Sequence, residues 1–200
     1  LARIARRFLT DRVNVHRPAR LEHVLIAEYW NDLVERLEQA IRSDVPNEAP
    51  FVPRLDPARP MGTTADVDFW TSKPVREVAR SHVNLVAADT DRWEQSAAWF
   101  IDNHVAVESF VKNDGLGFAI PYQHRQTLHD YVPDFLVKLR TGTTLVLEVK
   151  GYDPLAEVKA SAAQRWVMAV NAGRRFGRWW YEVVRRPSDV VEAIERAAES

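Results

Sequence analysis

One stretch, residues 131–151, constrains the fold of this chain more than any other. It reads YVPDFLVKLRTGTTLVLEVKG. Two mostly apolar runs, 132–139 and 145–149, are separated by a short connection that contains Gly142. A three-residue connection with glycine at its end is a common loop of antiparallel hairpins. We therefore expect two paired strands joined by residues 140–142.

The register of this hairpin decides which charged side chains meet. Side chains of a strand alternate between its two faces. If Leu139 pairs with Thr143, Asp134 lies directly opposite Glu148 and on the same face. Lys150 then converges on the same patch. A glycine bulge could shift the pairing by one residue, so this register is a hypothesis.

Such a patch of charges has a definite chemistry. Two carboxylates close together repel each other unless a cation neutralises them. A hard divalent ion such as Mg²⁺ takes one or two carboxylates and keeps several waters, and we expect Mn²⁺ to substitute for it. A lysine beside the ion can orient or deprotonate a water, or stabilise charge on a phosphate. Together these groups serve metal-assisted phosphodiester hydrolysis.

The same residues resemble a known signature. Pro133-Asp134 is followed, after a spacer of thirteen residues, by Glu148-x-Lys150. This resembles the PD-(D/E)XK nuclease signature. The alternative interpretation is a surface hairpin with scattered charges.

Composition narrows the class of protein. The chain has 200 residues and no cysteine, which removes disulfides, thiolate nucleophiles and Cys-based zinc sites and suits a reducing cytoplasm. No apolar run approaches the roughly 18 residues that indicate a membrane span.

The net charge of −1 counts mildly against avid DNA binding by this segment alone. Because the chain begins at Leu1 rather than Met, we expect a fragment of a longer protein.

The chain divides into three parts. Residues 1–45 form a helical extension, within which 21–42 carry a strong 3.6-residue apolar pattern that predicts a long amphipathic helix. Prolines recur through 46–62, which indicates an extended linker. Residues 63–200 form the main domain.

Helices and strands alternate within the main domain. Before the central hairpin we expect strands at 67–71 and 82–88 around a short helix at 73–80, a helix at 91–104, strands at 105–111 and 116–120, and a polar loop at 123–129. After the hairpin we expect an Ala-rich helix at 154–171 closed by Gly173, a strand at 179–184 and a last helix from Ser188. This order predicts an α/β fold with a mixed sheet around the central hairpin.

Further candidates for the site come from the helices. Glu94 lies on the edge of the apolar stripe of helix 91–104, where it is either a third carboxylate for the metal or a capping residue. Lys159 falls inside the apolar face of helix 154–171 and either snorkels past the core or contacts phosphate.

A basic and aromatic cluster follows that helix. Arg174, Arg175 and Arg178 alternate with aromatic residues up to Trp180. Such a cluster is suited to contacting a nucleic-acid backbone. The alternative is that the aromatic residues belong to the buried strand 179–184.

Several segments together resemble one family. They are TADVDFWTSKP (64–74), WEQSAA (93–98), VKNDGLGFAIPY (111–122), YVPDF (131–135), LEVKG (147–151) and QRWVMAVNA (164–172). They look like the C-terminal region of the restriction subunit of type III-like restriction–modification helicase–nucleases. The match covers roughly residues 60 to 185.

The resemblance implies a cytoplasmic, Mg²⁺-dependent DNA endonuclease. Its fold would be a restriction-endonuclease-like PD-(D/E)XK core, a mixed central sheet flanked by helices, with an N-terminal helical extension. Asp134 and Glu148 would hold the metal, with the Val149 carbonyl as a further ligand, and Lys150 would position the attacking water. The implied partners are DNA, a DEAD/DEAH-type ATPase motor and a methyltransferase subunit. No Walker-A loop occurs here, so we expect the motor upstream.

Two alternatives belong to other classes. The domain could keep the fold and bind DNA without cleaving it, or it could be a docking scaffold for the methyltransferase subunit, with helix 21–42 as the docking face. Metal-dependent nicking of DNA would separate the nuclease from the binding module, and co-purification would support the scaffold.

Overall fold

The computed structural model describes residues 63–87, 92–124, 127–151 and 153–200, together with scattered positions between 7 and 58. The chain divides into two compact units, Leu1–Ala49 and Pro50–Ser200. In the first unit, residues 29–34 and 36 are α-helical, while 22–23 form a 3₁₀ turn and Ile26 a bend. The other positions of the helix predicted over 21–42, and the linker 46–62 apart from Ala58, lie outside the described residues.

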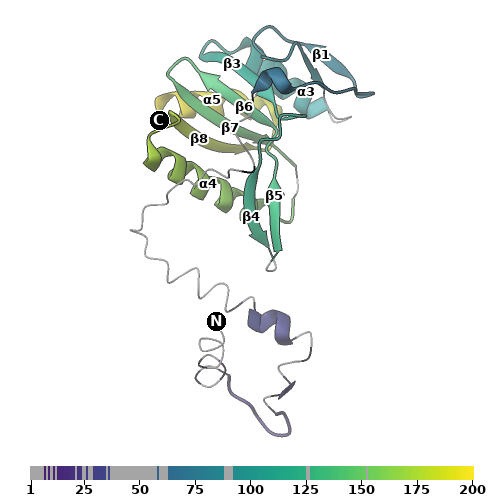
Figure 1. Cartoon of the computed structure of the whole chain (residues 1–200), viewed down its shortest axis with the longest axis vertical. Helices are drawn as coiled ribbons and strands as arrows, with labels where there is room; N and C mark the ends of the chain where they lie inside the picture. Colours follow the sequence, from purple (N-terminus) through teal and green to yellow (C-terminus); the bar gives the residue numbers. More distant parts are fainter. Residues whose placement is uncertain are drawn as a thin grey trace. The chain divides into compact units, whose positions relative to one another are not determined.

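Among the described residues of the second unit, four strands form a mixed central sheet (Figure 1). Their order is β3 (Val107–Lys112), β6 (Phe135–Leu139), β7 (Thr143–Val149) and β8 (Arg178–Val184). β6 is antiparallel to both β3 and β7, whereas β8 runs parallel to β7. The helix α4 (Ala156–Gly173) supplies the crossover that a parallel pair needs. The predicted α/β class with a mixed sheet is confirmed.

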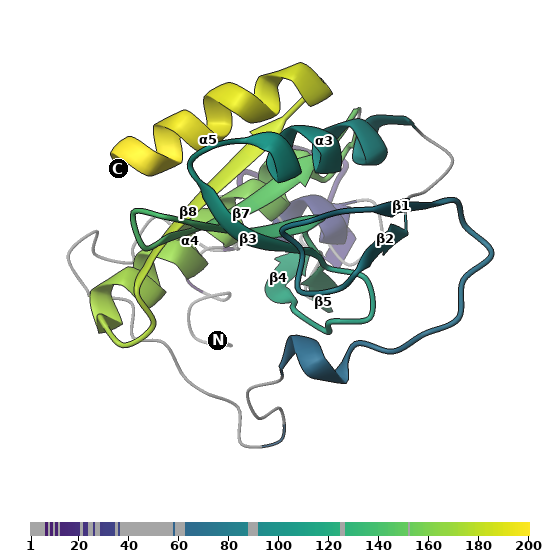
Figure 2. The same cartoon turned by 90° about the horizontal axis from the view of Figure 1, so that it is seen from above.

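Helices cover both faces of this sheet (Figure 2). α3 (Arg92–Asn103) and α5 (Val190–Glu199) lie on one face, and α4 lies on the other. No helix in the described part of the chain is long and apolar enough to cross a bilayer.

The alternation of side chains along β6 and β7 divides the core into two layers. Odd-numbered residues such as Val137 and Leu147 pack with Ile101 of α3 and Ile194 of α5. Even-numbered Val146 packs with Ala162 and Ala163 of α4. Because Asp134 and Glu148 are also even-numbered, their positions in the strands place them on the face that α4 covers.

The hairpin has the predicted register. Phe135 pairs with Leu147, and Lys138 pairs with Thr144, so continuing the ladder sets Asp134 opposite Glu148 without a one-residue shift. Gly142 adopts φ +92°, a backbone conformation that favours glycine. Its N–H donates to the Leu139 carbonyl at 2.9 Å and closes the loop.

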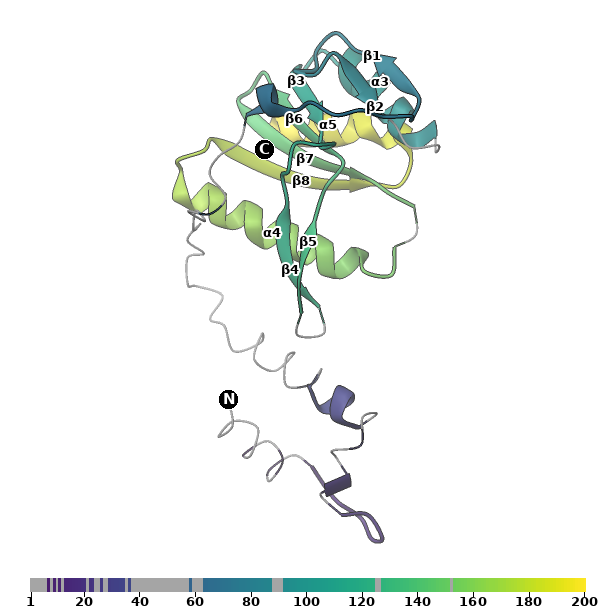
Figure 3. The same cartoon turned by 45° about the vertical axis from the view of Figure 1, so that its right-hand side comes forward.

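Residues 120–124 and 127–131 form a ribbon of two strands that the sequence did not predict. β4 (Ile120–His124) and β5 (Thr127–Tyr131) pair only with each other among the described strands and lie beside α4 (Figure 3). The polar loop predicted at 123–129 and the strand predicted at 116–120 are therefore wrong. Ile120, Tyr122 and Tyr131 are buried in the core layer under α4, and this distant packing stabilises the ribbon.

The helix predicted at 73–80 is also wrong. A turn, η2 (Thr64–Asp66), precedes the paired strands β1 (Val75–Glu77) and β2 (Leu85–Ala87). The Asp102 carboxylate accepts the N–H groups of Ala79 and Arg80 at 3.0 and 2.8 Å. The Arg80 carbonyl accepts the Phe110 N–H at 3.0 Å, and these distant partners hold the segment extended.

Two helix ends differ by a few residues from the prediction. α4 includes Gly173, and the left-handed residue that caps it is Arg174, with φ 48°. The last helix begins at Val190 after a 3₁₀ turn, η3 (Pro187–Asp189), rather than at Ser188.

Candidate functional site

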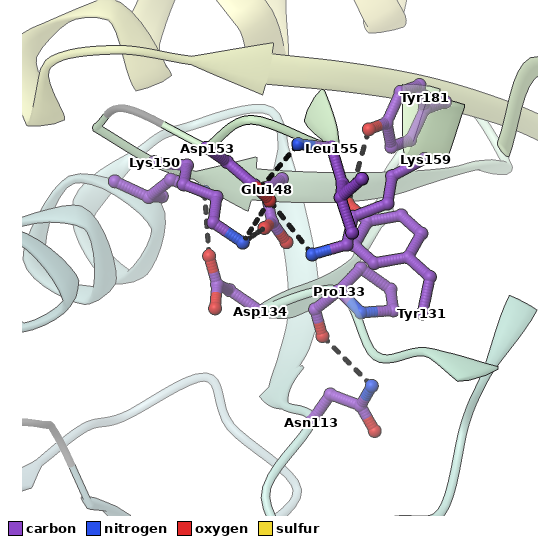
Figure 4. A network of polar contacts seen from close by, with 11 residues as sticks. Asn113, Tyr131, Pro133, Asp134, Glu148, Lys150, Asp153, Leu155, Lys159 and Tyr181 are labelled. Carbon is purple, nitrogen blue, oxygen red and sulfur yellow. Dashed lines mark hydrogen bonds and ion pairs between the residues drawn. The ribbon is translucent and has the colours of Figure 1, made fainter. Parts of the chain in front are cut away.

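The candidate site lies where β6 begins and β7 ends (Figure 4). Asp134 directly precedes β6, Glu148 is next to last in β7, and Lys150 follows β7 at the start of the connection to α4. Antiparallel pairing brings the start of one strand to the end of the other. The three residues of the predicted signature therefore converge.

Backbone hydrogen bonds fix Asp134. Its Oδ2 accepts the N–H of Val149 at 2.8 Å, and its carbonyl accepts the N–H of Asn113 at 2.8 Å. The buried Asn113 side chain donates to the carbonyls of Pro133 and Phe118 at 2.9 and 2.8 Å. The Pro-Asp step is thus held between the end of β7 and the end of β3.

Glu148 is a buried carboxylate with an unsatisfied oxygen. The residue is 5% exposed. Its Oε1 lies 3.3 Å from Lys150 Nζ, whereas its Oε2 is buried and makes no hydrogen bond within the described residues. Burying a charged oxygen without a partner is costly. The arrangement is suited to a cation at Oε2.

The pKa of Asp134 is also affected by this buried, negatively charged environment. Burial, together with the nearby charge of Glu148, raises its pKa to about 7, although the hydrogen bond from Val149 opposes the shift. The pair therefore favours either a shared proton or a bound cation over two free negative charges.

Lys150 belongs to a lysine network that consists of Lys150, Asp153 and Lys159. Asp153 Oδ2 lies 2.9 Å from Lys150 Nζ and 2.8 Å from Lys159 Nζ. Hydrogen bonds from Lys159 and then from Lys150 hold the pKa of Asp153 well below its usual range. Burial acts to lower the pKa of Lys150, but its bonds to Asp153 and Glu148 outweigh burial and raise it.

Two tyrosines lie beside the lysine network. The hydroxyls of Tyr131 and Tyr181 are 3.2 Å apart, and Lys159 Nζ lies 5.8 Å from the centre of the Tyr131 ring. Burial raises the pKa of both tyrosines, that of Tyr181 to about 12. A cleft of about 30 Å³ is lined by both tyrosines, Glu148, the lysine network and Arg185, among others. That volume admits about two water molecules.

Glu94 is not brought into this cluster. It lies on α3, and its carboxylate contacts Lys112 Nζ at 3.1 Å. Lys112 pairs with Phe135 across the β3–β6 ladder, so its position belongs to the sheet face that α3 covers. The charge of Glu94 still acts on Asp134 and is one of the causes that raise its pKa, after burial and the charge of Glu148. Its predicted role as a metal ligand stays a prediction.

The predicted basic cluster lies at the other end of β8. Arg178 pairs with Thr143, whereas Val183 pairs with Glu148. The two positions are five residue steps apart along the strand, which corresponds to about 17 Å. Arg174, Arg175 and Arg178 are exposed, and Lys159 is the one predicted phosphate contact that lines the cleft.

The aromatic residues of that cluster, Phe176, Trp179 and Trp180, are half-buried. Trp179 stacks on Phe118 with centroids 6.1 Å apart and meets Trp166 edge to face. The Arg178 guanidinium donates to the Ser200 carbonyl. The prediction of a strand at 179–184 is confirmed, but the strand is half-buried rather than buried, with Val184 as its one buried residue.

The residues that could hold a metal are few. No group of three or more His, Asp or Glu suited to a metal ion occurs in the described ranges. A metal would therefore rest on Asp134 and Glu148, with the Val149 carbonyl as the predicted further ligand. Two carboxylates are ligands of the kind that Mg²⁺ takes; Glu148 lines the cleft, whereas Asp134 does not.

Sequence reasoning missed four residues at the cleft. They are Asp153, Tyr131, Tyr181 and Arg185. A signal existed for Asp153, because Asp153-Pro154 directly before a predicted helix is typical of a helix start. Comparison of this chain with protein-family models, curated proteins and solved structures found no significant match.

Proposed function

We propose that this chain contains a Mg²⁺-dependent DNA endonuclease domain with a restriction-endonuclease-like PD-(D/E)XK core. The observation that carries the proposal is the buried Oε2 of Glu148, which meets no donor at normal hydrogen-bond geometry in the described part of the chain, although the carboxylate lies close enough to the Tyr131 hydroxyl to raise its pKa. Glu148 lies on the same sheet face as Asp134 and next to Lys150. A carboxylate pair with one buried oxygen unpaired, beside an ammonium group that meets only the other oxygen of Glu148, is suited to a divalent cation and a phosphate.

Each residue has a distinct role in this proposal. Asp134 and Glu148 hold Mg²⁺, which when bound supplies Lewis acidity and a water of lowered pKa. Lys150 orients the attacking water and offsets charge on the phosphate. The N–H of Val149 keeps the Asp134 carboxylate aligned. Tyr131 and Tyr181 limit the space beside Glu148.

The resemblance of segments 64–74 to 164–172 supports a wider proposal. The domain would serve the restriction subunit of a type III-like helicase–nuclease in the cytoplasm, tethered to a DEAD/DEAH-type motor and associated with a methyltransferase subunit. DNA would be the substrate.

A nicking assay tests the proposal. Supercoiled plasmid is incubated with Mg²⁺ and either wild-type protein, Asp134→Ala or Glu108→Ala. Glu108 is an exposed carboxylate on β3 and serves as the matched control. We expect nicking by wild type and the control, and none by Asp134→Ala. Binding without nicking by wild type would favour the non-cleaving DNA-binding module.

A further inference from the structure

Asp153 is held by three donors at the start of α4 (Figure 4). Its Oδ1 accepts the N–H of Leu155 at 2.9 Å. Its Oδ2 accepts Lys159 Nζ at 2.8 Å and lies 2.9 Å from Lys150 Nζ. The side chain is 9% exposed. A carboxylate with this many donors has little freedom to move, so it is a fixed point within the cleft.

Asp153 is the closer of the two acidic partners of Lys150. The Lys150 ammonium lies 2.9 Å from Asp153 Oδ2 and 3.3 Å from Glu148 Oε1. A lysine side chain has four flexible carbon–carbon bonds, and holding it in one place has an entropic cost. Without Asp153, Glu148 would be its remaining acidic partner in the described residues, and Lys150 would compete with a metal for that carboxylate.

Asp153 alone would neutralise the positive charge of Lys150, but Lys159 adds a second positive charge beside them. Two ammonium groups and one carboxylate leave the lysine network with a net positive charge. Lys159 itself is held by Asp153 and by the face of the Tyr131 ring. The network can thus fix Lys150 and still attract an anionic phosphate.

We propose that Asp153 is a positioning residue, which holds the ammonium of Lys150 beside Glu148 so that Lys150 can act on the water and the phosphate. Lys159 completes the network by holding Asp153 and keeping the local charge positive. This inference rests on the proposed nuclease function for its catalytic consequence, whereas the geometry of the network can be tested separately.

The substitution Asp153→Asn separates positioning from a role in starting α4. Asparagine keeps a side-chain oxygen for the Leu155 N–H, and Asn and Asp are similarly good at helix starts. It removes the negative charge that holds both lysines. Asp189→Asn is the matched control, because Asp189 also stands at a helix start and pairs with a cation, Arg186, away from the cleft.

The first measurement is NMR of the lysine ammonium groups in the metal-free protein. The chain contains five lysines, so assignment with Lys150→Met and Lys159→Met is practical. We expect couplings across hydrogen bonds from both Nζ atoms to the Asp153 side-chain carbon in wild type and in Asp189→Asn. In Asp153→Asn the Lys150 signal should broaden or disappear. Absence of the Lys150 coupling in wild type would overturn the proposal.

The second measurement is steady-state cleavage of a DNA duplex. We expect kcat of Asp153→Asn to fall about 10–100-fold, as is typical when a group that orients a catalytic residue is lost, with a much smaller change in KM and with the control at the wild-type rate. A wild-type kcat in Asp153→Asn would overturn the proposal. So would failure of both Asp153→Asn and Asp153→Ser to fold. If wild type does not cleave, the proposed function fails, and the coupling alone decides the geometry.

Discussion

At the scale of single residues, Glu148 is the position where β7 departs from the requirements of a stable core. Val146 and Leu147, its neighbours in the strand, are fully buried and apolar. A carboxylate at 5% exposure, with one oxygen unpaired, is unfavourable unless a cation compensates. Asp134 faces the same difficulty and meets it with a raised pKa. Both residues therefore lower stability in the absence of a metal.

The first prediction follows from the pKa of Asp134. Its folded value of about 7 exceeds the ordinary 3.8, so between these values the folded protein binds more protons than the unfolded chain. The contribution of Asp134 to the free energy of unfolding therefore falls as pH rises from about 4 to 7. The substitution Asp134→Asn removes this loss of stability at higher pH, because asparagine does not titrate. We expect the Tm of this variant to match wild type near pH ~4 and to exceed it by a few degrees at pH ~8.

Thermal unfolding across this pH range, without divalent ions, measures the effect. Glu108→Gln controls for the loss of an exposed carboxylate. Equal pH dependence of wild type and Asp134→Asn would show that Asp134 titrates normally.

The second prediction concerns the metal alone. Two carboxylates attract a divalent ion weakly unless a phosphate contributes further oxygens. We expect calorimetry with Mn²⁺ to detect little binding to the free protein and clear binding in the presence of a short duplex. Glu148→Gln should remove the second response. Binding should weaken below about pH 7, because a proton on Asp134 competes with the ion. Tight binding without DNA would indicate a preformed structural metal site instead.

At the scale of elements, the site depends on how the end of β3 supports the start of β6. Asn113 follows β3, and its amide spans the carbonyls of Phe118 and Pro133. These bonds link the loop before β4 to the residue directly before Asp134. A side chain outside the cleft thus controls the position of a candidate metal ligand.

The third prediction is that Asn113→Ala both destabilises the protein and slows cleavage. Two carbonyls lose their donor, and leaving a buried polar group unpaired costs about 1–3 kcal/mol. Urea unfolding measures the first effect and plasmid nicking the second. Asn103→Ala is the control, because the exposed Asn103 side chain donates within α3, to the Trp99 carbonyl. If the two variants behave alike, Asn113 does not support the site.

Local elements were predictable from the sequence, and contacts between distant segments were not. The register of β6 and β7 depends on the three-residue loop between two apolar runs, which is visible in residues 131–151. The ribbon β4–β5 depends on the packing of Tyr122 and Tyr131 under α4. This packing could not be predicted, because the polar residues between the two tyrosines are typical of a loop. For the site, the same distinction applies. Asp134, Glu148 and Lys150 lie in or next to one hairpin. By contrast, Tyr181 lies in β8 and Arg185 directly follows β8, far from the hairpin in sequence.

At the scale of the whole molecule, charge is distributed unevenly along β8. The chain carries a net charge of −1, so the DNA binding that we propose would depend on local clusters of positive charge. Arg185 lines the cleft at one end of β8. Arg178 lies at the other end, where the sequence predicted the contacts to the DNA backbone.

The fourth prediction compares these two arginines. We expect weak, salt-sensitive DNA binding by this chain, because few phosphates are neutralised. Arg185→Ala should weaken binding and reduce the slope of log K against log salt by about one, whereas Arg178→Ala should have a smaller effect. Gel-shift titrations over a salt series decide between them. A larger loss in Arg178→Ala would place the DNA path over the predicted cluster instead.

The parallel pairing of β8 with β7 also bears on how this domain can be shortened. β8 is last in the order of the four-stranded sheet, and β7 is almost entirely apolar and buried. A chain that ends before Arg178 would leave β7 as an open edge with unpaired N–H and C=O groups, and such an edge recruits other chains. Truncation there should produce aggregates rather than a smaller folded domain, although every residue of the predicted signature would still be present.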